Sequence, residues 1–150
     1  MKSFVNINTT PWTWVVRWFQ PNEKEEIRVG VDAVTGDVAS FDHVIEESQA
    51  GPELAEDDAR SIAGAFAAAR FDRSVTELSR YKLLEARSEN RQDRMDHYFI
   101  WENVANKVED GEFRVSVRIQ GDQVGGFRMY YKAPEEFLRK LSERKAKDAI

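Results

Sequence analysis

Residues 94–102, with the sequence Arg-Met-Asp-His-Tyr-Phe-Ile-Trp-Glu, say more about the fold than any other stretch of this chain. With the two-residue repeat of a β-strand, His97, Phe99 and Trp101 share one face of this segment. So much aromatic surface predicts a strand whose aromatic face lies against the core. His97 is also one of only two histidines, so core packing and any site chemistry are expected to meet here.

The composition is typical of one soluble globular domain, which we expect to span residues 1–150 with flexible ends at 1–10 and 143–150. Charged residues make up 33% and hydrophobic residues 41%, and the formal net charge is -5. This charge argues against nucleic-acid binding, because neutralising phosphates requires clustered positive charge. The chain has no cysteine, which excludes disulfides and zinc-thiolate sites. The apolar stretch 12–19 is interrupted by Arg17 and is too short to span a bilayer.

Alternation with a period of two predicts seven strands, separated in two places by turns that contain glycine. One turn covers residues 32–37, where Gly36 is expected at a positive φ, and the other is 120–122. The predicted strands are 12–19, 27–31, 38–45, 81–88, 95–101, 112–120 and 123–131.

Two segments instead show a helical period. The stripe Ala59, Ile62, Ala63, Phe66, Ala67 predicts a helix with acidic residues in its first turn and Arg70 near its end. Pro134 opens a second, mostly solvated helix. The order strands, helix, strands, helix predicts an α+β domain, with an antiparallel sheet of about six to seven strands and two helices packed on one face.

The chain contains a short internal echo. Each of the two similar segments is a hairpin with a Gly-Asp turn, and each is associated with a helix. This similarity leaves open both an internal duplication and a common hairpin pattern. The first segment has Val29-x-Val31, Gly36-Asp37, Val38 and Phe41, and the second has Val115-x-Val117, Gly121-Asp122, Val124 and Phe127.

Histidine and carboxylate side chains on residues 94–102 suit acid–base or metal chemistry, but their spacing argues against it. Asp96 and His97 are adjacent in a strand and point to opposite faces. We therefore predict that His97 is a core histidine with satisfied hydrogen bonds and that Arg94 pairs with Asp96 on one face. We predict no catalytic residue, no metal site and no cofactor.

Two exposed surfaces are possible binding sites. Five arginines alternate with apolar strand residues, which predicts either a basic strip for an acidic peptide or a solvated face neutralised by Glu26 and Glu112. The tryptophans at 12, 14 and 18 share one face, where they either anchor the core or lie half exposed on an edge strand. The arginines are Arg17, Arg28, Arg114, Arg118 and Arg128.

Several stretches across the chain resemble a soluble domain of bacterial CPBP-family membrane proteins, the CAAX-protease-like or abortive-infection intramembrane metalloproteases. The hairpin-plus-helix units also resemble the PepSY fold. The matching residues are Val16-Arg17-Trp18-Phe19 with Pro21; Glu25-Glu26; Val31-Asp32, Thr35-Gly36 and Phe41-x-His43; Arg94-x-Asp96-His97-x-Phe99-x-Trp101-Glu102; Gly121-Asp122-x-Val124-x-Gly126-Phe127; and Lys132-x-Pro134-Glu135.

The resemblance implies an accessory domain and not the protease itself. The family's Glu-Glu-x-x-x-Arg motif lies in apolar membrane helices, whereas residues 135–139 here form a charged segment with the arginine one position early. The implied function is a non-catalytic regulatory or interaction domain, outside the cytoplasm, that binds a peptide, a protein or its own membrane-embedded protease portion. Membrane association would then come only through flanking segments outside this chain.

Two alternatives remain at this stage. One is a small enzyme or ligand-binding domain with a pocket around His97 and Glu102, and the other is a homo-oligomer held by the tryptophan strand. The residues predicted to take part in binding are Arg94, Asp96, His97, Trp101, Glu102, Arg17, Arg118 and Arg128.

Overall fold

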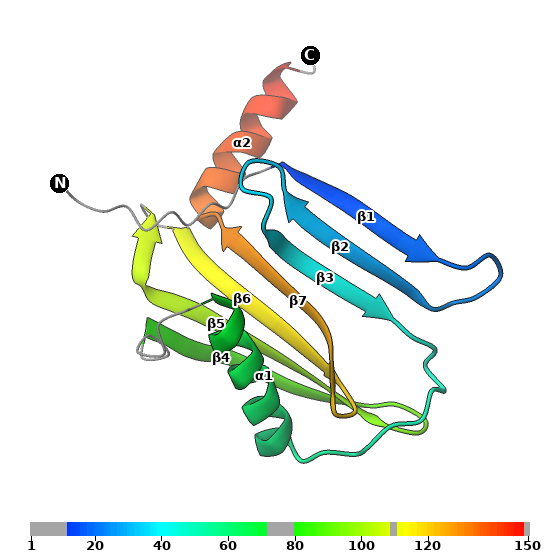
Figure 1. Ribbon diagram of the computed structural model, residues 1–150. Coiled ribbons are helices and arrows are strands. Elements are labelled where there is room, and N and C mark those ends of the chain that lie inside the picture. The colour runs from blue at the N-terminus through cyan, green and yellow to red at the C-terminus, as the bar shows by residue number, and fades with distance from the viewer. Residues whose placement is uncertain (1–11, 72–79, 109–110, 149–150) are drawn as a thin grey trace.

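A computed structural model describes residues 12–71, 80–108 and 111–148 of the chain (Figure 1). Its strands and helices confirm the predicted α+β class. None of the helices in these ranges has the length and apolar composition needed to cross a lipid bilayer. In chain order the elements are β1 (Thr13–Phe19), β2 (Glu26–Asp32), β3 (Val38–Val44), α1 (Glu56–Phe71), β4 (Tyr81–Asn90), β5 (Met95–Val108), β6 (Gly111–Gln120), β7 (Gln123–Lys132) and α2 (Glu135–Asp148).

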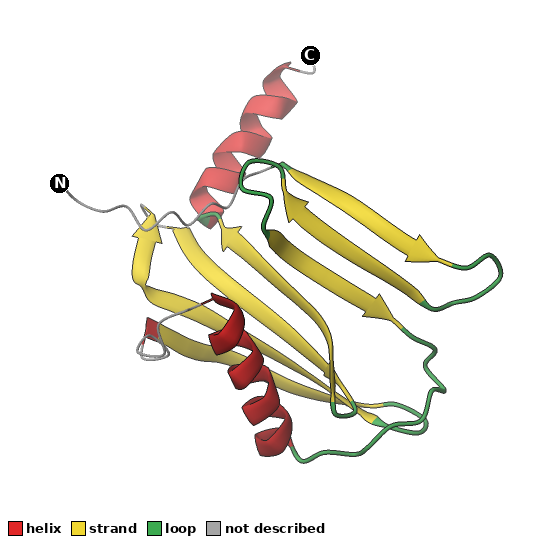
Figure 2. Cartoon of the chain, in the orientation of Figure 1, coloured by secondary structure: helices red, strands yellow, loops and turns green. Residues whose placement is uncertain are grey.

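The seven strands form one antiparallel sheet in the order β1-β2-β3-β7-β6-β5-β4 (Figure 2). Hairpins join most neighbours, whereas β3 leads through α1 to β4 at the far edge. The β3–β7 junction is the narrowest part of the sheet, because the two strands pair only over Ser40–Asp42 and Gly126–Arg128. The sheet therefore consists of two hairpin-based halves joined at one short seam.

Helix α1 covers one face of the half made by β5, β6 and β7. Ala59 and Ala63 are fully buried, and their small side chains let the helix approach the sheet closely. Further along the helix, the ring of Phe66 lies 6.2 Å from that of Phe41 and 5.4 Å from that of Phe127. The predicted helical stripe is thus confirmed, and it forms the core together with Phe99, Phe113, Val115, Val117, Ile119 and Phe127.

The expectation that two helices pack on one face is wrong for α2. Figure 1 shows α2 projecting from the end of β7, away from the sheet, and its apolar residues Phe137, Leu138 and Leu141 are exposed. Only residues 133 and 134 join it to β7. Pro134 restricts Ala133 to extended backbone, so the chain continues outward from the strand and does not fold back.

The ends of the chain were predicted to be flexible at 1–10 and 143–150. The first range lies outside the described residues, and α2 continues as helix to Asp148 within the second. Strand β5 also runs well past the predicted end at 101, reaching Val108.

The internal echo has a spatial counterpart at the seam. Phe41 and Phe127, which match in the echo, are direct register partners across β3 and β7. Gly36 and Gly121 each adopt a positive φ in the corresponding turns, at 77° and 61°. The strands β1-β2-β3 and β5-β6-β7 are therefore related by an approximate two-fold axis near the phenylalanine pair.

The strand register changes one detail of the echo. Val29 lies opposite Phe41, and Val117 lies opposite Phe127. Val29 therefore corresponds to Val117, whereas the sequence pattern had matched it with Val115. The same register matches Val16 of β1 with Phe99 of β5.

Candidate interaction surface

Strand β1 is an edge of the sheet, and every residue in it is exposed. Trp12, just before it, and Trp14 expose 72% and 70% of their surface, and Trp18 exposes 55%. Of the two possibilities for the tryptophans, the half-exposed edge strand is confirmed. Among the described residues, strand β1 therefore presents both a backbone edge without a neighbouring strand and large apolar side chains, a combination that natural edge strands usually avoid.

A buried carboxylate attaches β1 to β2. Glu26 is 7% exposed and forms ion pairs with Arg17 of β1 and Arg28 of its own strand. Arg17 also lies 4.4 Å over the ring of Phe19. Desolvation raises the pKa of Glu26, but the hydrogen bonds and charges of Arg17 and Arg28 outweigh it and hold that pKa below its ordinary value of 4.5.

This lowered pKa predicts acid-dependent attachment of β1. The stabilisation from Glu26 is present above pH 4.5 and is lost as the pH falls through the lower pKa of the folded state. As the pH falls through this range, the tryptophan fluorescence of the wild type should therefore shift towards the spectrum of solvent-exposed tryptophan. Glu26→Gln should show the shift already at neutral pH and should lose its acid dependence, as a fluorescence titration would reveal. An unchanged titration in Glu26→Gln would contradict this role.

On the face opposite α1, the predicted arginine strip is largely neutralised. Arg118 donates to Asp42 at 2.6 Å and to the carbonyls of His43 and Gly125 at 3.1 and 2.9 Å. Arg114 pairs with Glu112 at 2.6 Å. Arg17, Arg28, Arg114 and Arg118 are thus each paired with a carboxylate, as the neutralised alternative predicts, with Arg17 and Arg28 sharing Glu26.

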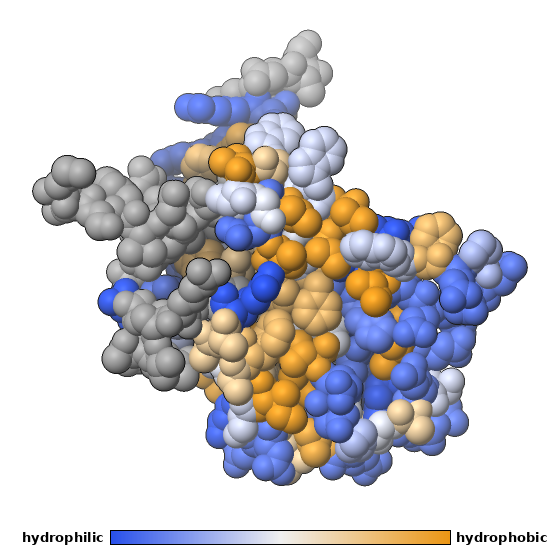
Figure 3. Space-filling view, viewed as in Figure 1, coloured by the Kyte–Doolittle hydropathy of each residue, from blue (hydrophilic) through white to orange (hydrophobic). Residues whose placement is uncertain are grey.

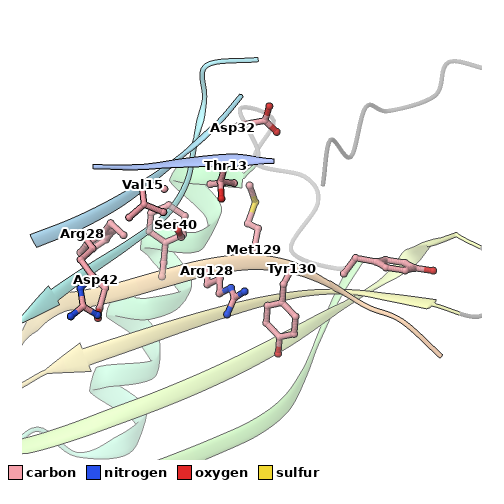
Figure 4. A pocket seen from close by; sticks show the side chains of 14 residues that line it. Thr13, Val15, Arg28, Asp32, Ser40, Asp42, Arg128, Met129 and Tyr130 are labelled. Carbon is pink, nitrogen blue, oxygen red and sulfur yellow. The ribbon is translucent and has the colours of Figure 1, made fainter. Parts of the chain in front are cut away.

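Arg128 is the exception among these five arginines. It makes no ion pair with any described residue, and its guanidinium lies 5.8 Å from the ring centre of Tyr130. It lines a groove of about 750 Å³ at the β3–β7 seam, where the two strands diverge beyond Ser40. Figure 4 shows Arg128 and Tyr130 projecting to the same side of β7, with Met129 on the other side.

The predicted pair of Arg94 with Asp96 is confirmed, and both side chains are buried. Arg94 Nε donates to Asp96 Oδ1 at 2.8 Å, and Arg91 Nε donates to Oδ2 at 3.1 Å. Arg94 Nη1 also reaches the carbonyls of Glu46 and Gln49 at 2.8 and 2.7 Å. This cluster fastens the loop between β3 and α1 to the start of β5.

The prediction of a core histidine at position 97 is also confirmed. His97 is 1% exposed, and its ring stacks on that of Phe99 with an interplanar angle of 11°. Its Nε2 donates to the carbonyl of Leu54 at 3.0 Å, and its Nδ1 lies 2.9 Å from Ser88 Oγ. Because a carbonyl only accepts, Nε2 carries a proton, and Nδ1 is the ring nitrogen that pairs with the serine hydroxyl. Both ring nitrogens are occupied by structural partners.

The remaining predicted site residues do not join His97. Trp101 follows Phe99 on the α1 side, with ring centres 5.7 Å apart. Glu102 lies on the opposite face, where it is the register partner of Arg114 and Lys82. Within the described residues, His97 and Glu102 therefore lie on opposite faces of the sheet and do not face one another, as the enzyme alternative had placed them.

The sequence did not identify the other exposed residues of the edge. Val15 is 66% exposed and Phe19 is 56% exposed, one on each side of Arg17 on the open face. Strand β1 has apolar residues on both faces, a pattern that is also typical of a strand buried on both sides. Its position at the start of the run of strands was the only signal for an edge.

Comparisons with protein-family models, curated proteins and solved structures find no match to this chain.

Proposed function

We propose that this chain is a non-catalytic interaction domain that binds an extended segment of a partner protein along β1. The observation that carries the proposal is the edge strand itself, whose side chains are all exposed and whose outer backbone edge has no strand beside it within the described residues. Added strands gain affinity from main-chain hydrogen bonds and specificity from alternate side chains.

The chemistry of β1 defines the segment that fits. On the α1 side the added strand would meet Trp14 and Trp18, and on the open face it would meet Val15 and Phe19. Arg17 is already paired with Glu26, so it is not a free cation that would select an acidic partner. The partner is therefore an extended, largely apolar or β-branched segment. The resemblance to CPBP-associated domains suggests the membrane-embedded protease portion, outside the cytoplasm, as its source.

The probe for this proposal is a labelled eight-residue peptide of alternating valine and threonine. We expect fluorescence polarisation to show saturable binding, and a peptide N-methylated at alternate residues should not bind because it lacks the main-chain donors. Val15→Lys should weaken binding roughly fivefold or more, since a lysine on an edge strand opposes pairing.

Val34→Lys is the matched control, because Val34 is equally exposed but lies in the β2–β3 turn. It should bind like the wild type. Equal binding of the plain and N-methylated peptides, or no binding of either, would rule out strand addition at β1.

A further inference from the structure

We infer that the α1-side face of β1, β2 and β3 is covered by helix α2 of a second copy of this chain. Two copies would exchange their α2 helices reciprocally and form a symmetric dimer. This goes beyond the proposed function, because it concerns a face of the sheet and not its backbone edge.

The first observation is an apolar face on which no described helix packs, here termed the uncovered face. Figure 3 shows apolar surface continuing beyond α1 over the neighbouring strands. Val16 and Ile27 on it are 41% and 40% exposed. A soluble chain rarely leaves so large an apolar area in water without a partner. The uncovered face consists of Trp14, Val16, Trp18, Ile27, Val29 and Val31.

The second observation is that a helix, α1, covers the equivalent face in the other half of the sheet. In the other half of the sheet, Phe99 and Val117 occupy the positions that match Val16 and Val29. There they are 0% and 2% exposed, because α1 packs on them. Helix α1 follows the β1-β2-β3 half and covers the β5-β6-β7 half. The approximate two-fold axis therefore assigns α2, which follows β5-β6-β7, to the β1-β2-β3 half.

Helix α2 has a suitable length and an apolar stripe for packing on the uncovered face. Its residues Phe137, Leu138 and Leu141 form an apolar stripe that contacts no core within the described residues. With 14 residues it is about 21 Å long, close to the roughly 23 Å of a seven-residue strand. The helix as a whole thus matches the strand in length, and its apolar stripe lies in its first half.

Charge also favours one orientation. Helix α1 begins near the β6–β7 turn, where Pro52 packs on Gly121, so by the two-fold relation α2 would begin near the β2–β3 turn. Its basic second half, with Arg144 and Lys145, would then reach the β1–β2 loop. That loop carries two acidic residues, Glu23 and Glu25, and one basic residue, Lys24, so it is negative overall.

The connection to β7 favours a second copy over the chain's own helix. Eleven residues, 45–55, allow α1 to swing across the seam, whereas only Ala133 and Pro134 precede α2. Pro134 keeps Ala133 extended. The C-terminal end of α1 also lies against the start of β3, between α2 and the uncovered face of the same chain. Arg70 donates there to the carbonyl of Val38 at 3.3 Å.

Sedimentation of the full chain tests the association. We expect a reversible dimer, and Leu138→Ala with Leu141→Ala should weaken it roughly tenfold or more, because burying a single leucine is worth more than that factor. The matched control, Glu136→Ala with Lys140→Ala, truncates the opposite side of the helix and should leave the dimer intact. A wild type that stays monomeric at all concentrations would overturn the inference.

Disulfide trapping tests the occupant, because the chain has no cysteine of its own. After mixing, Leu138→Cys and Val31→Cys proteins should form a covalent pair on oxidation, whereas Lys140→Cys should not pair with Val31→Cys. The double variant Leu138→Cys/Val31→Cys should become a linked dimer. A monomer with an internal disulfide would show that α2 closes on its own sheet, and an absence of cross-links would show that α2 does not reach this face; either would overturn the inference.

Different variants test the two proposals, so one can be wrong while the other holds. Val15→Lys lies on the open face and should block the peptide without affecting the dimer, and the leucine variants should do the reverse. A dimer abolished by Val15→Lys would mean that two β1 edges pair directly, which would overturn the docking of α2.

Discussion

Replacing Arg94 with alanine is expected to destabilise the domain by about 3–5 kcal/mol, the range for removing one partner of a buried charge pair. Of its side-chain partners among the described residues, Asp96, which is 1% exposed, would keep Arg91 alone. The carbonyls of Glu46 and Gln49 would lose their shared donor at the same time. Arg94→Lys should recover only part of the loss, because an ammonium cannot reproduce the forked geometry of the guanidinium.

Urea denaturation measures this effect, and hydrogen exchange locates it. The loop between β3 and α1 should exchange first in Arg94→Ala, because the arginine binds that loop directly. Arg87→Ala is the control: Arg87 is an exposed arginine of β4, 4.6 Å from the ring centre of Tyr98, and should cost about 1 kcal/mol or less. A loss for Arg94→Ala no larger than that of the control would show that the cluster does not hold the loop.

The sequence predicted the parts of the fold that depend on local periodicity. The seven strands, α1 and the structural roles of Arg94, Asp96 and His97 follow from which side chains share a strand or helix face. The two-residue spacing of Arg94 and Asp96 was enough to predict their pair, because both lie on one side of the same segment. None of this required knowledge of the strand order.

What depended on strand order could not be predicted. Whether the tryptophans of β1 lie in the core or at an edge is decided by the strand next to them, and alternation within β1 does not carry that information. The position of α2 depends on a two-residue connection and on the end of α1, which are contacts between distant segments. The neutralisation of Arg118 by Asp42 likewise joins strands 76 residues apart in sequence.

The second large effect is expected at the centre of the core. Phe99→Ala should cost about 3–5 kcal/mol, since the ring is 0% exposed and its removal leaves a cavity between α1 and the sheet. The ring also contacts those of His97 and Trp101, with ring centres 6.2 and 5.7 Å away. Denaturant unfolding followed by circular dichroism would measure the loss, and full retention of stability would contradict the assigned core.

Val16→Ala is the informative comparison, because Val16 holds the same place in the first half of the sheet as Phe99 in the second. In dilute protein it should cost less than about 1 kcal/mol, since its side chain is already 41% exposed. If α2 of a second copy covers this face, the cost of Val16→Ala should rise with protein concentration, while that of Phe99→Ala stays nearly constant. A cost of Val16→Ala that does not change with concentration would mean that this valine stays in water, although its counterpart lies at the centre of the core.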